Sequence, residues 1–286
     1  MRTIRKQRRS TSAARMLLVL MLLTLAVAGC RNVARNDPSA QATATAEALD
    51  AAEARLQLAG TAWEVAYFFD PAQQVAILPG TRLTTNFLAD RYVGSGSCNW
   101  YLGTYAVDAE QMRLYSPATT ALQCADEAVN EQEARFFNIM ANTIAYAIEG
   151  EQLLAFTSDE QRLATYNPAE PTPFEATPWA LKFMSSGDDA APILPFTEVT
   201  AIFADGQVTG AGGCNTYSAP YTRDGANLTI GAIAVTEMQC SEPAGVMEQE
   251  AAFLANLAQV AAVEQVGGVL TLLDADSAPL MLLGAP

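Results

Sequence analysis

GSGSCN at residues 94–99 and GAGGCN at residues 210–215 are two copies of one glycine-rich turn that ends in Cys-Asn. They lie 116 residues apart, and the same offset places Trp63 on Trp179. It also aligns a second set of landmarks, which are Tyr101 with Tyr217, Tyr105 with Tyr221 and Cys124 with Cys240. Self-similarity at a fixed offset is the signature of a repeated structural unit. The chain therefore contains two tandem copies of one domain.

The copies are separated by a proline-rich segment. Residues 167–173 read NPAEPTP, and prolines at this density favour extended backbone over helix. We therefore expect a first domain at residues 58–166, a linker at 167–173 and a second domain at 174–286. A domain of about 110 residues is long enough for a hydrophobic core of its own.

Within each copy the local pattern is mostly that of β-strands. Residues 61–69 and 179–184 are rich in aromatic and β-branched side chains, and glycine and asparagine punctuate the segments that follow. Apolar residues at helical spacing predict one helix per copy, at residues 130–142 and 247–259. In the first helix we expect Ala134, Phe137, Met140 and Ala141 on the buried face, which Phe136 and Ile139 widen. The predicted fold class is mainly β (α+β), in two small antiparallel domains with one helix each.

The N-terminus resembles a bacterial lipoprotein signal. A basic segment without acids precedes a short apolar stretch, which ends in Ala28-Gly29-Cys30. This ending is similar to a lipobox, so residues 1–29 are predicted to be removed and Cys30 to carry the lipid. An ordinary signal peptide that ends near a cysteine is the alternative. Residues 30–57 are predicted to form a flexible tether, and the protein is expected in the cell envelope, outside the cytoplasm and anchored to the membrane.

The other four cysteines form two pairs with equal spacing. Cys98 and Cys124 are 26 residues apart, as are Cys214 and Cys240. Export places them in an oxidising compartment, so we predict one disulfide in each copy. Zinc binding is the alternative, but the spacing contains no Cys-x-x-Cys pair.

The charge balance limits the possible partners. The chain has 16 basic and 31 acidic residues, and residues 1–29 contain six of the basic ones and none of the acids. The predicted mature part therefore has a formal net charge of −21, which repels nucleic acid. The chain contains no histidine, the commonest general base and metal ligand. No P-loop, dinucleotide fingerprint or nucleophile elbow occurs, so we expect no enzymatic activity, no cofactor and no metal.

Four residues that recur in both copies are tentative binding residues. Asn99 and Asn215 follow the glycine-rich turns and are placed to contact a ligand, although asparagine also holds turns in unusual conformations. Tyr101 and Tyr217 could line the mouth of a barrel, although aromatic residues in strands also pack in cores. Both interpretations remain open at this stage.

The second copy resembles the META domain family, the HslJ-like proteins. The resemblance rests on Gly213-Cys214-Asn215-Thr216-Tyr217, on TEMQC at residues 236–240, and on Glu250 followed by Phe253-Leu254. The first copy matches more loosely, with Ser97 before Cys98 and leucine in the place of methionine in TALQC at residues 120–124. The resemblance implies a small antiparallel, barrel-like sheet with a helix in each copy. It also implies a role in the envelope linked to stress tolerance, and it supplies no catalytic residues.

These observations predict a non-enzymatic, lipid-anchored envelope protein that binds a partner through its tandem domains. The partner would be an envelope protein or a small ligand, in addition to the membrane that holds the lipid. The alternative is a small-molecule-binding protein that uses the interior of a barrel. A third interpretation is a hydrolase that works through paired acids such as Asp188 and Asp189.

Overall fold

The computed structural model describes residues 57–70, 72–186 and 189–286. The predicted signal peptide, Cys30 and all of the predicted tether except its last residue lie outside these residues. Asp188, one of the two acids of the hydrolase interpretation, lies outside them as well.

The first copy is a closed antiparallel barrel. Its elements are β1 (Thr61–Asp70), β2 (Gln73–Ala76), β3 (Thr84–Phe87), β4 (Arg91–Ser95), β5 (Trp100–Asp108), β6 (Gln111–Leu114), β7 (Ala118–Thr119), α2 (Glu127–Asn142), β8 (Ala145–Glu149), β9 (Gln152–Phe156) and β10 (Arg162–Pro168). Neighbours follow the order β10-β9-β8-β6-β5-β4-β3-β1, and β10 pairs with β1. These eight strands therefore form a ring, while β2 pairs with β1 and β7 with β5 at its margin.

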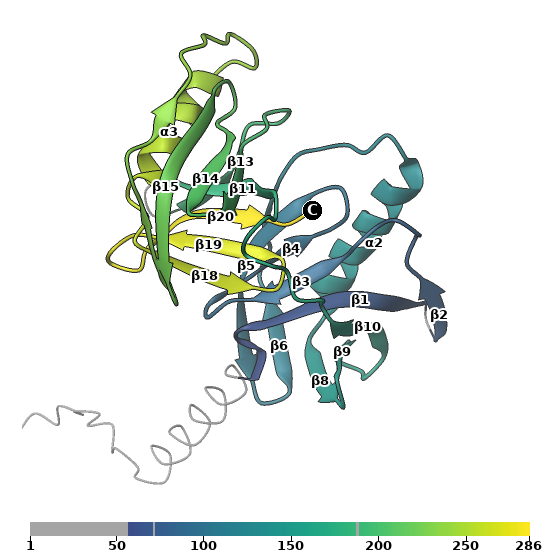
Figure 1. Cartoon of the computed structure of the whole chain (residues 1–286). Coiled ribbons are helices and arrows are strands. Elements are labelled where there is room, and N and C mark those ends of the chain that lie inside the picture. The colour runs from purple at the N-terminus through teal and green to yellow at the C-terminus, as the bar shows by residue number, and fades with distance from the viewer. Residues whose placement is uncertain (1–56, 71, 187–188) are drawn as a thin grey trace, which may run out of the picture. The chain divides into compact units, whose positions relative to one another are not determined.

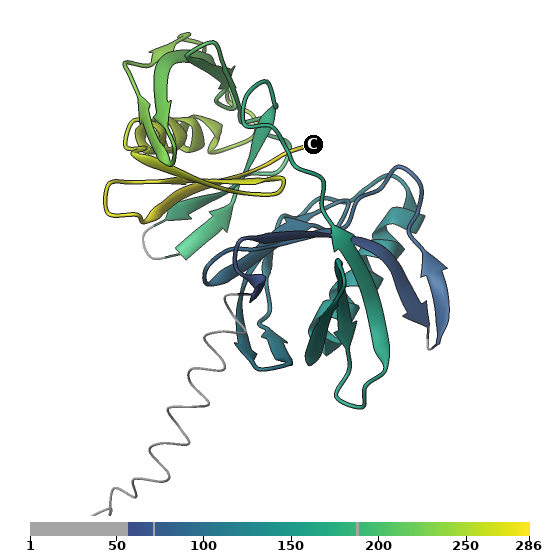
Figure 2. The same ribbon diagram turned by 60° about the horizontal axis from the view of Figure 1, so that its bottom comes forward.

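The second copy repeats this topology. Its elements are β11 (Trp179–Ser186), β12 (Asp189–Pro192), β13 (Thr200–Ala204), β14 (Gln207–Ala211), β15 (Thr216–Asp224), β16 (Asn227–Ile230), β17 (Ala234–Val235), α3 (Val246–Leu257), β18 (Ala262–Val266), β19 (Val269–Leu273) and β20 (Pro279–Gly284). Eight strands run in the order β11-β13-β14-β15-β16-β18-β19-β20, and β11 pairs with β20 to close the ring. Each barrel carries one long helix (Figure 1), and Figure 2 shows the same elements from a second direction.

Side chains alternate between buried and more exposed positions along the strands, and the buried ones fill the barrel interiors. In β15 the side chains of Tyr217, Ala219 and Tyr221 are buried, while those between them are more exposed. This period of two is what a strand with one face on a core requires. The helix completes the packing, because the Phe253 ring of α3 lies 5.3 Å from the Tyr217 ring. Phe136 of α2 lies 5.8 Å from Tyr101 in the same way. Each barrel interior is thus a packed core of side chains.

The predicted helices are present, and Phe136, Ile139 and Met140 of the first are buried as expected, but the helix limits and the rest of that buried face differ. Helix α2 begins at Glu127, three residues earlier than predicted, because the Asp126 carboxylate accepts a hydrogen bond from the Ala128 N–H and caps the helix. Ala134 and Ala141 are exposed, contrary to the prediction. The buried face instead includes the polar side chains of Gln132 and Glu133. Helix α3 ends at Leu257, two residues before the predicted end.

Several strand limits also differ from the predicted segments. Strand β10 continues through Asn167 and Pro168, the first two residues of the predicted linker, because they pair with Glu64 and Trp63 of β1. The short strands β2, β7, β12 and β17 were not predicted. They have two to four residues each and owe their conformation to the strand beside them.

Both predicted disulfides are formed. Cys98 pairs with Cys124, and Cys214 pairs with Cys240, with Cα–Cα distances of 5.8 and 5.9 Å. Each bridge connects the end of the glycine-rich turn to the segment that leads to the helix. Among residues 57–70, 72–186 and 189–286, no helix combines the length and apolar content that a bilayer crossing requires.

The second disulfide is expected to contribute strongly to stability. Replacing Cys214 and Cys240 together by alanine should lower the free energy of unfolding by roughly 3.5 kcal/mol, because the unfolded chain regains the entropy of a 26-residue loop. Denaturant unfolding of the oxidised protein measures the change, and the matched variant of Cys98 and Cys124 should show a similar loss. An unchanged midpoint would contradict this expectation.

Candidate functional site

A buried glutamate joins three segments of the second barrel. The Glu250 carboxylate accepts hydrogen bonds from the backbone N–H of Cys214 at 2.9 Å and of Asn215 at 2.6 Å. Its other oxygen accepts from the Asn215 side-chain amide at 2.7 Å. The same amide reaches on to the segment before Cys240, where the Asn215 Nδ2 donates to the Met238 carbonyl at 3.1 Å. The Thr236 hydroxyl donates to the Asn215 Oδ1, and we call this arrangement of Glu250, Asn215 and Thr236 the glutamate clasp of the second barrel.

The first barrel contains the same clasp, made by Glu133, Asn99 and Thr120. Glu133 accepts from the N–H of Cys98 at 3.2 Å and of Asn99 at 2.6 Å, and from the Asn99 amide at 2.7 Å. Asn99 also donates to the Leu122 carbonyl at 3.0 Å. The side chains of both glutamates and both asparagines are buried. The duplicated asparagines and a duplicated glutamate therefore form one network in each copy.

The asparagine amides have no hydrogen-bonding capacity left. The Asn215 Oδ1 accepts from the Thr236 hydroxyl at 2.8 Å and from the Met238 N–H at 2.6 Å, while its two N–H groups donate to Met238 and Glu250. An amide offers two donors and two acceptor lone pairs, so all four are used. Asn99 is satisfied in the same way. These bonds favour the structural interpretation of both residues, and their role in ligand binding stays a prediction without support from the geometry.

The two tyrosines lie in the barrel cores. The Tyr217 hydroxyl donates to the Thr200 carbonyl at 2.8 Å, and the Tyr101 hydroxyl bonds the Thr84 carbonyl at 2.5 Å. Burial raises the pKa of both phenols, so they remain protonated donors at neutral pH. Their rings pack against the helices. A binding role for Tyr101 and Tyr217 likewise remains a prediction.

A second helix side chain holds a loop beside each clasp. In α3 the Gln249 Oε1 accepts from the Leu194 N–H at 2.6 Å, and its Nε2 donates to the Thr197 hydroxyl at 3.0 Å. Gln132 makes the equivalent bonds to Leu78 and Thr81 in the first barrel, at 2.7 and 2.8 Å. The loops read ILPGT at residues 77–81 and ILPFT at residues 193–197. Adjacent Gln and Glu side chains thus fix two loops to each helix.

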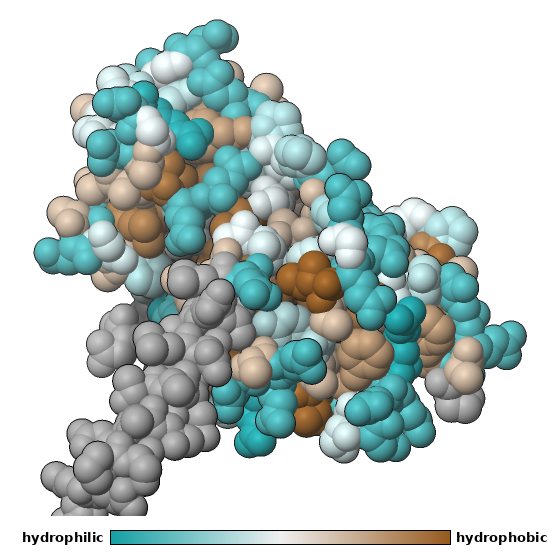
Figure 3. Space-filling view, turned by 90° about the horizontal axis from the view of Figure 1, so that it is seen from below, coloured by the Kyte–Doolittle hydropathy of each residue, from teal (hydrophilic) through white to brown (hydrophobic). Residues whose placement is uncertain are grey.

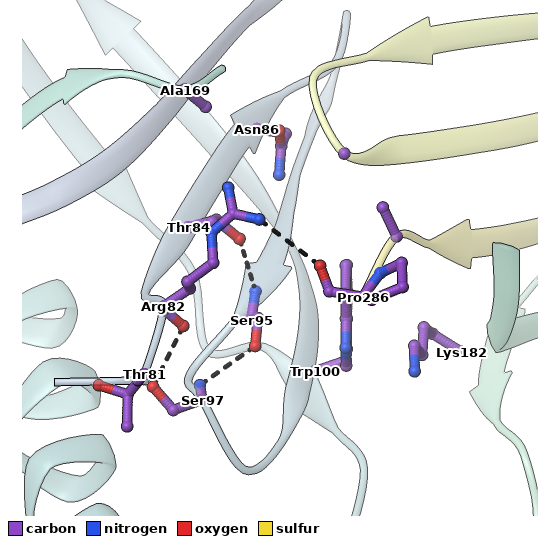
Figure 4. A pocket seen from close by; sticks show the side chains of 13 residues that line it. Thr81, Arg82, Thr84, Asn86, Ser95, Ser97, Trp100, Ala169, Lys182 and Pro286 are labelled. Carbon is purple, nitrogen blue, oxygen red and sulfur yellow. Dashed lines mark hydrogen bonds between the residues drawn. The ribbon is translucent and has the colours of Figure 1, made fainter. Parts of the chain in front are cut away.

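The glycines of the turn are required by close packing. A Cβ atom on Gly212 would lie 2.9 Å from the Glu250 Oε2, and one on Gly96 would lie 2.5 Å from the Glu133 Oε1. Such contacts are too short for a carbon and an oxygen, so a side chain here would displace the carboxylate. The neighbouring strand also holds the turn: the Ser95 N–H donates to the Thr84 hydroxyl at 3.1 Å (Figure 4), and the Ala211 N–H donates to the Thr200 hydroxyl at the same distance in the second barrel.

The clasp sets the ionisation of Glu250. Burial is the largest single influence and raises its pKa, but the hydrogen bonds from Asn215 and Cys214 lower the pKa by more in sum. The pKa of Glu250 therefore lies below the usual 4.5. An ionised carboxylate that accepts these three hydrogen bonds stabilises the fold.

The exposed side chains around the clasp differ between the two copies. At the tip of the ILPxT loop, the first barrel has Gly80 at φ +80° and the second has Phe196 at φ +62°. The Phe196 side chain is 92% exposed. Met238, the neighbour of the Asn215 amide, is exposed as well, and Leu122 takes its place in the first barrel. On the face drawn in Figure 3, apolar residues occur in small groups among polar ones.

The Asp274 carboxylate belongs to the turn between β19 and β20. Asp274 accepts hydrogen bonds from the N–H groups of Asp276 and Ala278 at 2.9 and 2.8 Å, as expected of a turn. Within the described parts of the chain, no three histidine, cysteine, aspartate or glutamate side chains are grouped to hold a metal ion.

Sequence reasoning missed Glu133 and the two glutamines. A signal for them exists: Gln-Glu occurs at residues 132–133 and again at 249–250. The pairs are 117 residues apart, so the 116-residue offset of the cysteines does not align them.

Removing the Glu250 carboxylate should destabilise the second barrel. Glu250→Leu leaves two buried donors of Asn215 and the part-buried N–H of Cys214 without an acceptor, so we expect the free energy of unfolding to fall by about 3 kcal/mol. Glu248→Leu, at an exposed position of the same helix, is the control and should change it by less than about 0.5 kcal/mol. Equal effects of the two variants in denaturant unfolding would show that the clasp contributes nothing.

The same carboxylate predicts a pH dependence. Because its folded pKa is lowered, Glu250 stabilises the fold above the unfolded value of 4.5, and this contribution is lost as the pH falls through the folded pKa. Between about pH 6 and about pH 3, unfolding free energies should therefore fall less steeply for Glu250→Gln than for the unaltered protein. Parallel pH profiles of the two proteins would contradict this assignment.

Comparisons with known proteins agree with the duplicated architecture. The META domain model matches the chain twice, at residues 56–170 and 172–286. A search of curated proteins finds no match.

Similar solved structures each cover about one copy. One is an NMR structure of a protein from Burkholderia xenovorans, 16% identical, with a TM-score of 0.36, covering 41% of this chain and 87% of that one. Another is a crystal structure of a DUF4847 family protein from Bacteroides vulgatus, 15% identical, with a TM-score of 0.31, covering 40% of this chain and 96% of that one. At these TM-scores they carry no argument about the fold or the site. The two matches to the family model span most of the residues, and the chain therefore belongs to the META domain family.

Proposed function

We propose that this chain is a lipid-anchored, extracytoplasmic protein whose tandem META domains form a non-enzymatic interaction module of the cell envelope. The observation that carries the proposal is the placement of the duplicated polar residues. The glutamate clasps are buried, and the hydrogen-bonding capacity of their asparagines is used within the chain. The residues common to both copies thus serve the fold, which leaves the outer surface for function.

The packed cores favour the proposal of an interaction module and argue against a ligand site inside a barrel. Trp179, Phe203, Phe253 and their neighbours form one cluster in the second barrel, and each of these three is fully buried. The first barrel has an equivalent cluster around Phe68 and Phe136. Ligand pockets in proteins are clefts with room for most of the ligand surface. Interiors filled by aromatic side chains and a helix do not offer such room.

The second barrel is the better candidate for the contact surface. Phe196 has a bulky side chain at a positive φ, which costs conformational energy, and its ring is exposed to water. The first barrel avoids both costs with Gly80 in the same loop. Strained, exposed residues cluster at functional sites, and exposed aromatic residues are frequent anchors of protein interfaces.

The anchoring part of the proposal rests on the N-terminal sequence. Ala28-Gly29-Cys30 resembles a lipobox, and two disulfide-bonded domains follow it. Disulfides persist in oxidising compartments outside the cytoplasm. The link to stress tolerance follows from the family resemblance alone.

One experiment tests anchoring and contact together. The full chain is produced in the organism that encodes it, with a photoreactive phenylalanine analogue in place of Phe196, and intact cells are irradiated. We expect a discrete adduct in the membrane fraction, because the side chain at this position would lie against the partner. The same analogue at Gly80 is the matched control and should give no such adduct.

Cys30→Ser completes the test. This variant should leave the membrane fraction, since its N-terminus could not be lipidated. An unaltered membrane association would refute the anchor, and irradiation products no different from the Gly80 control would refute a contact at Phe196.

A further inference from the structure

The second barrel has an open backbone edge beside its clasp. Strand β17 pairs with β15 on one side, through Tyr217 opposite Val235 and Ser218 opposite Ala234. In the sheet order it lies off the closed ring, with β15 as its partner. The segment continues past β17, and every residue from Ala234 to Gln239 is exposed.

The hydrogen bonds that this segment makes toward β15 and the clasp show which way its backbone groups point. The Thr236 N–H donates to the Thr216 carbonyl at 3.1 Å, and the Met238 N–H donates to the Asn215 Oδ1 at 2.6 Å. Backbone groups of successive residues in an extended strand point to opposite sides. Val235, the last residue of β17, therefore turns its N–H and C=O away from the barrel, and Glu237 follows between two residues whose N–H groups face inward. This edge offers backbone groups of the kind to which another strand adds.

The clasp makes this edge rigid. Asn215 bonds both the N–H and the C=O of Met238, and the disulfide fixes the segment two residues later at Cys240. A preorganised edge loses little conformational entropy when a partner binds. A shallow hollow of about 300 Å³ lies along β15 and β17, lined by Thr216, Tyr217, Ser218, Ala234, Val235 and Thr236.

Charge identifies the kind of strand that fits. From Asp224 to the end, the chain has eight acidic residues and no lysine or arginine. Glu237 lies in the open edge itself, and Glu242 follows Cys240 in an exposed position. An acidic edge attracts a basic segment and disfavours pairing with a second copy of the same edge, where Glu237 would face like charge.

We propose that the β17 edge, defined as residues 234–238, binds an extended, basic segment of a partner polypeptide by β-strand addition. This inference rests on the proposed interaction role and gives it a surface and a partner chemistry. Val235 and Met238, both exposed, provide the apolar contacts beside the backbone bonds. The corresponding positions of the first barrel are Thr119 and Leu122, and Ala121 stands in place of Glu237, so the charge is specific to the second copy.

The test uses the full chain, with both disulfides formed, in a non-ionic detergent. The probe is an eight-residue peptide of alternating lysine and valine, and its counterpart has glutamate in place of lysine. We expect the basic peptide to bind, with NMR shifts of the Val235 and Glu237 amides and their protection from hydrogen exchange. The acidic peptide should not bind. Shifts confined to another surface would overturn the proposal.

Two substitutions separate backbone pairing from charge. Glu237→Pro removes one outward N–H without touching an inward bond, and it should weaken binding by about tenfold or more. Ala121→Pro is the matched control in the first barrel and should leave binding unchanged. Glu237→Gln keeps the N–H and removes the charge, so it should weaken binding of the basic peptide less than proline does.

The outcomes distinguish this inference from the broader proposal. Equal affinity of Glu237→Pro and the unaltered protein would overturn strand addition, provided that both have the same unfolding free energy. Binding by a basic peptide that is N-methylated at every residue would overturn it independently of folding. Neither result affects the photocrosslinking at Phe196, and a failure of that experiment leaves these peptide measurements intact.

Discussion

Each barrel depends on one buried carboxylate that accepts three hydrogen bonds. Burying an ionised group is costly unless it is fully paired, and here the donors are the backbone of the glycine-rich turn and an asparagine amide. Without Glu250, the buried N–H of Asn215 and the part-buried N–H of Cys214 would have no acceptor. The glycines, the asparagine and the disulfide are all arranged around this group. The turn, the helix and the segment before the second cysteine therefore form one unit.

Much of the fold could be predicted, because its signals are local or repeated. The 116-residue offset showed two domains, equal cysteine spacing predicted both disulfides, and aromatic and β-branched runs indicated strands. The buried face of the first helix was predicted only in part: Phe136, Ile139 and Met140 are buried as expected, but Ala134 and Ala141 are exposed. Hydrophobic periodicity gave no reason to expect a buried glutamate at residue 133. That glutamate is buried only because donors from a turn more than 30 residues away surround it.

The site was harder to predict for the same physical reason. Asn99 and Asn215 attracted attention through their repetition, but repetition alone does not separate a ligand contact from an internal support. Their hydrogen bonds join segments 21 to 35 residues apart, and such contacts follow from the folded topology. The two-residue strand β17 has no sequence signal of its own. Its edge is visible only once β15 is placed beside it and the neighbouring bonds show which way the backbone points.

The pairing of the first and last strands has a consequence for how such a chain can arise. In each barrel the chain leaves beside the strand through which it entered, as Trp63 opposite Pro168 and Ala180 opposite Gly284 show. A domain with adjacent ends can be copied in tandem by gene duplication, because a few linking residues suffice and no strand order is disturbed. The same property predicts that either barrel tolerates circular permutation. Once duplicated, the two copies can carry different surfaces on the same frame, as Gly80 and Phe196 do at the tip of the same loop.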